Sequence, residues 1–133
     1  MRKADNLLKL SAFHYIIMEN LMCMEGIIMK VITLCGSMKF QSDMMAITQK
    51  MALEGKCILT PTYSVLKNIE HTPEQIAKLK EAHFKRIEMS DAILIVDINN
   101  YIGDSTRLEI DYAKKLGKEL IYYSDSELLV KSE

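Results

Sequence analysis

The chain has 133 residues, of which 49% are apolar and 26% charged, and its formal net charge at pH 7 is −1. This composition excludes a disordered chain and suits one compact domain. Because positive and negative charges nearly cancel, we do not expect nucleic acid as a partner.

The three cysteines, Cys23, Cys35 and Cys57, form no CxxC pair and have no metal-ligand spacing. An odd number of thiols fits reduced cysteines in the cytoplasm, so we expect a cytoplasmic protein without a metal site. Cys35 and Cys57 lie in strand-like runs and are expected to be small core residues.

The first 28 residues differ from the rest. Leu7, Leu10, His14, Ile17 and Leu21 follow helical spacing, but the uncharged run is too short to cross a bilayer, so no membrane partner is expected. Residues 1–28 are predicted to form an amphipathic helix that docks on the domain or a partner subunit, or else a leader. The single α/β domain is then expected over residues 29–133.

Strand-like and helix-like segments alternate after residue 28. Strands are predicted over residues 29–35, 56–61, 92–98 and 119–124, because each is a short, largely apolar run. Helices are predicted over residues 36–55 and 73–91, in the second half of residues 98–118, and briefly in the last ten residues. In the first helix Phe40, Met44, Ile47 and Met51 share one face.

This alternation predicts parallel strands joined by right-handed crossovers. We expect an α/β fold: a three-layer sandwich around a doubly wound parallel sheet of four to five strands, flavodoxin- or Rossmann-like, in the order 2-1-3-4. Ligands of such sheets bind beyond the carboxyl ends of the strands, near the switch point between the first and third strands.

The segment CGSMKF follows the first predicted strand. Gly36 permits a close backbone approach, and Ser37 can cap the following helix or bind a sugar or phosphate, with Lys39 nearby. The absence of GxGxxG and GxxxxGK[ST] patterns argues against dinucleotide binding and P-loop hydrolysis. Tyr63 and Tyr101 lie on loops at the same edge and are candidates to stack on a flat ring.

The segment DINNYIGDSTRLE follows the third predicted strand. Gly103, Asp104 and Ser105 are candidate ligand contacts. Glu109 has two interpretations: Thr106 and Glu109 match a capping box, a purely structural use of glutamate, but the helical wheel turns Glu109 toward the sheet and the cleft. A carboxylate in that position has an altered pKa or reactivity.

Two further residues are candidate acids. Asp97 ends the third strand and either binds a ligand or fixes the loop after it. His83 shares a helix face with Ile76, Leu79 and Ile87, so it faces inward, as a core histidine or as a catalyst.

The segments ITLCGSMKF, SDAILIVD and GDSTRLEIDYAKKLGK resemble the nucleoside 2-deoxyribosyltransferase superfamily, which includes 2′-deoxynucleoside 5′-monophosphate N-glycosidases. The resemblance implies that Glu109 is the nucleophile and that the turn of Gly36 and Ser37 lies in the sugar or phosphate site. Many members carry an aspartate where this chain has His83.

The resemblance implies cleavage of the N-glycosidic bond of a (deoxy)nucleoside or its 5′-monophosphate through a glutamyl-sugar intermediate, resolved by water or by another base. His83 or an aspartate would protonate the leaving base, no cofactor would be needed, and a homodimer or larger homo-oligomer is expected. The alternative is a catalytically inactive nucleotide-binding sensor of the same fold. A third is an interaction domain in which Glu109 only caps its helix.

Overall fold

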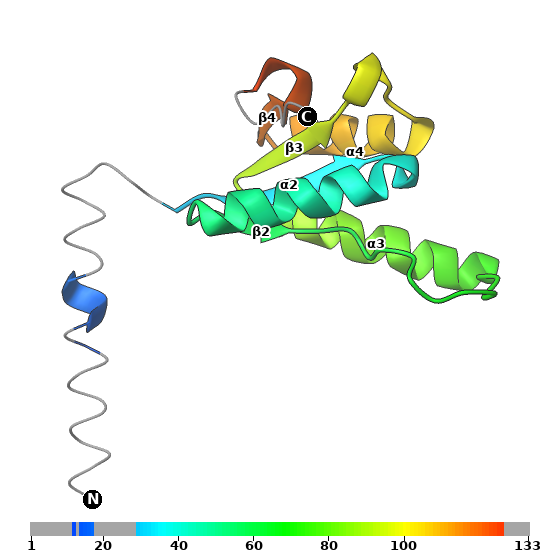
Figure 1. Ribbon diagram of the computed structural model, residues 1–133, viewed down its shortest axis with the longest axis horizontal. Coiled ribbons are helices and arrows are strands. Elements are labelled where there is room, and N and C mark those ends of the chain that lie inside the picture. Colours follow the sequence, from blue (N-terminus) through cyan, green and yellow to red (C-terminus); the bar gives the residue numbers. More distant parts are fainter. Residues whose placement is uncertain (1–11, 13, 18–28, 127–133) are drawn as a thin grey trace, which may run out of the picture.

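The computed structural model describes residues 12, 14–17 and 29–126. Its sheet has four parallel strands, β1 (Val31–Gly36), β2 (Cys57–Leu59), β3 (Ala92–Val96) and β4 (Glu119–Tyr122), in the order β2-β1-β3-β4. The helices α2 (Gln41–Leu53), α3 (Pro73–Met89) and α4 (Asp104–Lys115) connect them (Figure 1). The predicted strand order is confirmed.

The central strand β3 explains why the sheet is parallel and covered. All five of its residues are buried, and its apolar run does not alternate, as expected for a strand with helices on both faces. Each neighbour pairs in register with it, so that Gly36 at the end of β1 lies opposite Val96. The carboxyl ends of β1 and β3 therefore meet at one edge.

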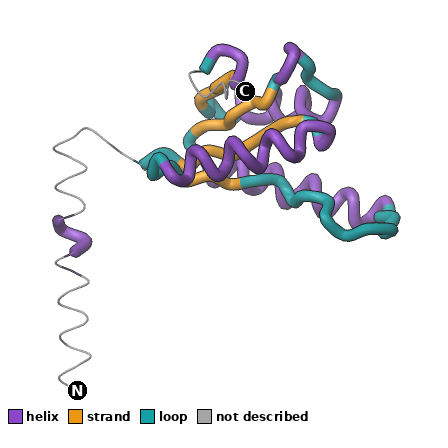
Figure 2. Tube along the Cα trace, viewed as in Figure 1, coloured by secondary structure: helices purple, strands orange, loops and turns teal. Residues whose placement is uncertain are grey.

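Two hydrophobic clusters fill the space on either side of the sheet. On one face α2 contributes Met44, Ile47 and Met51. On the other face α3 contributes Ile87, and α4 contributes Ile110 and Ala113. The result is the predicted three-layer sandwich, with α2 alone on one side of the sheet and α3 with α4 on the other (Figure 2).

Helix α3 begins with a capping box that the sequence analysis did not identify. The Thr72 hydroxyl accepts a hydrogen bond from the Gln75 amide, and the Gln75 side chain accepts one from the Thr72 amide. Only His83 and Ile87 of this helix are buried, whereas Ile76 and Leu79 are exposed. Of the four residues predicted to face inward, only the two in the second half of the helix are therefore buried.

Element boundaries differ locally from the predictions. The first predicted helix divides into a 3₁₀ turn, Met38–Phe40, and α2. The last strand ends at Tyr122, because Tyr123–Asp125 form a 3₁₀ turn. Most of the predicted 1–28 extension, Cys23, and residues 127–133 of the expected terminal helix lie outside the described residues. Within the described part, no helix has the length and apolar character needed to span a membrane.

Candidate functional site

A cavity of about 430 Å³ lies beyond the carboxyl ends of β1 and β3, where the sequence analysis expected the ligand. The 3₁₀ turn after β1, the loop after β2, helix α3 and the start of α4 form its walls. Its lining residues are Gly36, Ser37, Met38, Pro61, Thr62, Ile76, Leu79, Lys80, His83, Tyr101, Gly103, Asp104, Ser105, Thr106 and Glu109.

Glu109 is the largely buried carboxylate of this cavity. It lies in the second turn of α4, and its side chain is 16% exposed. Its Oε1 atom is 3.6 Å from Nε2 of His83, and the same His83 nitrogen is 3.6 Å from Sγ of Cys35. Three elements that are distant in sequence, β1, α3 and α4, thus bring a thiol, an imidazole and a carboxylate together.

Burial shifts the pKa values of two of the three titratable groups of this cluster, Glu109 and His83, in opposite directions. Burial raises the pKa of Glu109 to about 7, and a hydrogen bond from the Cys35 thiol opposes that rise only in part. Burial and the nearby positive charge of Arg86 lower the pKa of His83 to about 4. His83 is therefore a neutral imidazole at pH 7, and Glu109 is divided between its acid and its carboxylate.

The predicted capping box at Glu109 is wrong. Helix α4 begins three residues earlier than that pattern requires, with Gly103 as its N-cap, and no side chain caps it. Thr106 is inside the helix and buried rather than at its start. Glu109 is too far along the helix to reach a free backbone amide, so capping does not account for its burial.

Most of the predicted site residues come together around the cavity. Its lining includes His83, Glu109, Gly36, Ser37, Tyr101, Gly103, Asp104 and Ser105. Gly36 also serves packing, because a Cβ atom there would lie 3.1 Å from Cβ of Val96 and 3.2 Å from Sδ of Met44.

Three predicted site residues do not line the cavity. The Asp97 carboxylate accepts hydrogen bonds from the amide and the hydroxyl of Ser124, at 2.9 and 2.6 Å, so it fixes the end of β3 to the turn after β4. Tyr63 packs against the hydrophobic cluster under α2. The ammonium of Lys39 lies 3.1 Å from the ring centre of Tyr101, which lines the cavity, in a cation–π contact.

Part of the cavity wall was not among the candidate site residues. Lys80, Ile76 and Leu79 line it from α3, and Pro61 and Thr62 line it from the loop after β2. That loop was expected at the ligand edge, because Tyr63 lies on it, whereas the part of the wall that α3 forms depends on the crossover, and no local pattern indicated it. Cys35 was predicted as a core residue, and it is fully buried, but its contact with His83 was not foreseen.

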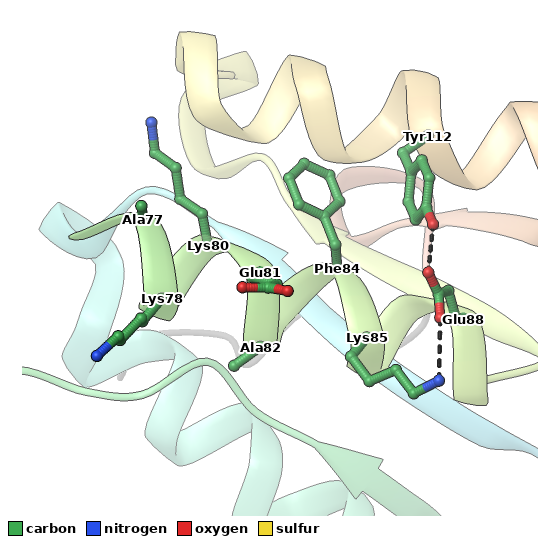
Figure 3. A pocket seen from close by; sticks show the side chains of 9 residues that line it. All are labelled: Ala77, Lys78, Lys80, Glu81, Ala82, Phe84, Lys85, Glu88 and Tyr112. Atoms are coloured by element: carbon green, nitrogen blue, oxygen red, sulfur yellow. Dashed lines mark hydrogen bonds and ion pairs between the residues drawn. The ribbon is translucent and has the colours of Figure 1, made fainter. Parts of the chain in front are cut away.

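A second hollow, of about 890 Å³, lies along α3 and beside Tyr112 of α4 (Figure 3). Its charged groups are exposed, and two of them are already engaged, since Glu88 accepts a hydrogen bond from Tyr112 and pairs with Lys85. It contains no buried titrating group. We therefore assign the chemistry to the smaller cavity around Glu109.

Comparison with solved structures finds a similar chain, described as "2-desoxiribosyltransferase from Leishmania mexicana". The two share 24% sequence identity and a TM-score of 0.51, over 71% of this chain and 63% of that chain. The chain has a nucleoside 2-deoxyribosyltransferase-like fold. The match covers somewhat less than two thirds of the length of that protein. No protein-family model matches the sequence, and no curated protein matches it.

Proposed function

We propose that the protein cleaves the N-glycosidic bond of a 2′-deoxynucleoside or its 5′-monophosphate, with Glu109 as the nucleophile. The observation that carries this proposal is the largely buried Glu109 carboxylate in the cavity at the carboxyl ends of β1 and β3. The structurally similar protein is itself named as a deoxyribosyltransferase, which is the same class of reaction. The resemblance of the GDSTRLEIDYAKKLGK segment supports the same residue.

In the proposed reaction an oxygen of the ionised Glu109 attacks C1′ of the sugar as the bond from C1′ to the base nitrogen breaks. The bonding pair leaves with the base, which takes a proton from water at the exposed rim formed by Asp104 and Ser105. Water or a second base then attacks C1′, loses its proton to the hydroxide left by the first step, and releases Glu109 as a carboxylate. Attack by water gives hydrolysis, and attack by a second base gives transfer.

His83 is assigned to positioning in this scheme. A group with a pKa of about 4 carries too little imidazolium at neutral pH to protonate a leaving base efficiently. Its Nε2 atom, 3.6 Å from Glu109, instead limits where the carboxylate can lie. The resemblance implied instead that His83 or an aspartate protonates the leaving base.

Several polar groups of the cavity suit a sugar or a phosphate. Ser37 and Ser105 offer hydroxyls, and Lys80 offers a cation for a 5′-phosphate. The first turn of α4 begins at Gly103 without a side-chain cap, so its free amides add to this donor set. The Tyr101 ring provides an apolar surface for a base.

A binding module without turnover is the second candidate. The raised pKa of Glu109 keeps part of the nucleophile protonated at pH 7, and Asp97, one predicted acid, is engaged by Ser124. This candidate predicts ligand affinity without release of base.

We also propose that the protein acts as a homodimer in the cytoplasm. Ile76 and Leu79 of α3 are 43% and 38% exposed although they line the cavity, and a second copy would cover them. The free thiols of Cys35 and Cys57 suit a reducing compartment. Light scattering of the protein and of Ile76→Asp tests the dimer: a monomeric wild type would exclude it.

The experiment that tests the reaction measures release of free base from deoxynucleosides and their monophosphates, with and without a second base. We expect Glu109→Gln to reduce kcat at least about 1,000-fold, as for loss of a covalent nucleophile. Asp111→Asn, an exposed change on the same helix, serves as the control. A 2′-fluoro-2′-deoxy analogue should leave a sugar adduct on the peptide that contains Glu109.

One outcome would contradict the enzyme assignment, and another would contradict the role of Glu109. If wild type binds the nucleotides but releases no base across the panel, the binding module is the better description. If Glu109→Gln retains turnover, another group is the nucleophile.

A further inference from the structure

We propose that Cys35, His83 and Glu109 form a binding site for a divalent transition metal, best suited to Zn²⁺, and that the bound metal switches the active site off. The structure brings one ligand atom from each residue within 4.8 Å of the other two. The sequence spacing gave no indication of such a site, because each ligand comes from a different element.

Two of the three separations between the ligand atoms fit a tetrahedral zinc site, and the third is within 4.8 Å. With bonds of about 2.3 Å to sulfur and about 2.0–2.1 Å to nitrogen and oxygen, tetrahedral angles separate the donors by roughly 3.3–3.6 Å. The separations from His83 Nε2 are 3.6 Å to Cys35 Sγ and 3.6 Å to Glu109 Oε1. One imidazole nitrogen therefore faces both partners, and an ion can bind between them with little movement.

The donor set also fits the ion chemically. A thiolate and an imidazole suit zinc better than magnesium or calcium, which prefer oxygen ligands. Binding forms Zn–S, Zn–N and Zn–O bonds, and the proton of the Cys35 thiol and any proton on Glu109 pass to water. The thiolate and the carboxylate then cancel the charge of Zn²⁺, so the occupied buried site is neutral and avoids an uncompensated buried charge.

The position of the cluster gives the ion a route and an open coordination site. His83 and Glu109 line the cavity, and Cys35 is fully buried behind them, so the ion enters from the cavity. The fourth ligand is then a water on the cavity side. Oε2 of Glu109 is buried and forms no hydrogen bond with the described residues, so it remains available for such a water or for a bidentate contact.

The consequence for catalysis rests on the proposed function, whereas metal binding does not. A carboxylate oxygen bound to zinc has its lone pairs engaged and cannot attack C1′. Zinc should therefore inhibit base release, and a chelator should restore it.

Cobalt(II) is the probe, because tetrahedral Co²⁺ with a thiolate ligand gives intense visible bands and a thiolate-to-cobalt charge-transfer band. We expect titration of the full-length protein to produce these bands at one equivalent of Co²⁺, and equimolar Zn²⁺ to abolish them. Removal of a group that hydrogen-bonds to a metal ligand typically lowers metal affinity about 10- to 100-fold. Removal of a ligand itself should lower the affinity more, so Cys35→Ser should weaken Zn²⁺ binding at least about 100-fold. Cys57→Ser, which alters a thiol outside the cluster, is the matched control.

The proposal is overturned if wild type gives only the weak spectrum of six-coordinate cobalt, or if the charge-transfer band survives in Cys35→Ser. Circular dichroism first checks that the variant folds. If it does not, His83→Gln takes its place and should lose the tetrahedral visible bands. A tetrahedral cobalt spectrum without any turnover refutes the enzyme proposal alone, whereas turnover that Zn²⁺ leaves unchanged refutes the switch.

Discussion

The imidazole of His83 and the carboxylate of Glu109 lie 3.6 Å apart, and burial reverses their usual order of protonation. In water a histidine loses its proton about two pH units above a glutamic acid, so an ion pair exists between the two pKa values. Here the pKa of His83 is about 4 and that of Glu109 about 7. Between these values both groups are neutral, and the desolvation of two charges outweighs their attraction.

The activity should therefore rise with pH across neutrality. Only ionised Glu109 attacks, so kcat/KM should increase about tenfold per pH unit well below pH 7 and level off above it. Base release from a deoxynucleoside, followed from pH 5 to 9 with a chelator present, measures the profile. Asp111→Asn should share the profile, and a level rate down to pH 5 would contradict the raised pKa.

The stability of the chain should depend on pH in the opposite sense. The pKa of Glu109 is raised from 4.5 to about 7, so its stabilising contribution is complete below pH 4.5 and is lost as the pH rises through 7. We compare the free energy of unfolding of Glu109→Gln with that of wild type. As the pH is raised from 4.5 to 8, this difference should shift in favour of Glu109→Gln by up to about 3 kcal/mol. Urea unfolding with a chelator measures this difference, and a constant gap between the two proteins would refute it.

The parts of this structure that were predictable follow from local chemistry. The apolar run of β3 and the alternation of elements predict a parallel sheet, and the order 2-1-3-4 is its simplest winding. The direction of Glu109 follows from helical periodicity. These features depend on residues within one element and its immediate neighbours.

The remaining features depend on contacts between elements. Thr106 and Glu109 match a capping pattern, but burial of Thr106 against the core favours a helix that begins at Asp104. The Cys35 thiol meets His83 only because β1 and α3 pack together. Lys80 lines the cavity because the crossover brings α3 beside it. Spacing along the chain contains none of this information.

Gly36 should be required for packing of the fold. Its missing side chain leaves room for Val96 and Met44, which a Cβ atom would approach to 3.1 and 3.2 Å. Both neighbours are fully buried, so we expect Gly36→Ala to lower the free energy of unfolding by about 1–3 kcal/mol. Gly103→Ala is the matched control, because a Cβ there meets only ordinary contacts at 3.6 Å or more and should cost less than about 1 kcal/mol. Equal losses would contradict the packing argument.

Asp97 should act on stability rather than on chemistry. The sequence placed it at the ligand edge, but the residue is 5% exposed and its carboxylate accepts two hydrogen bonds from Ser124. Asp97→Asn replaces a charged acceptor by an amide that cannot accept both, so we expect a loss of about 1.5–3 kcal/mol in the free energy of unfolding. Ser124→Ala, which removes only the hydroxyl, should cost about 1 kcal/mol. Unfolding in urea separates the two variants. If Asp97→Asn kept its stability and lost base release, Asp97 would be a catalytic residue after all.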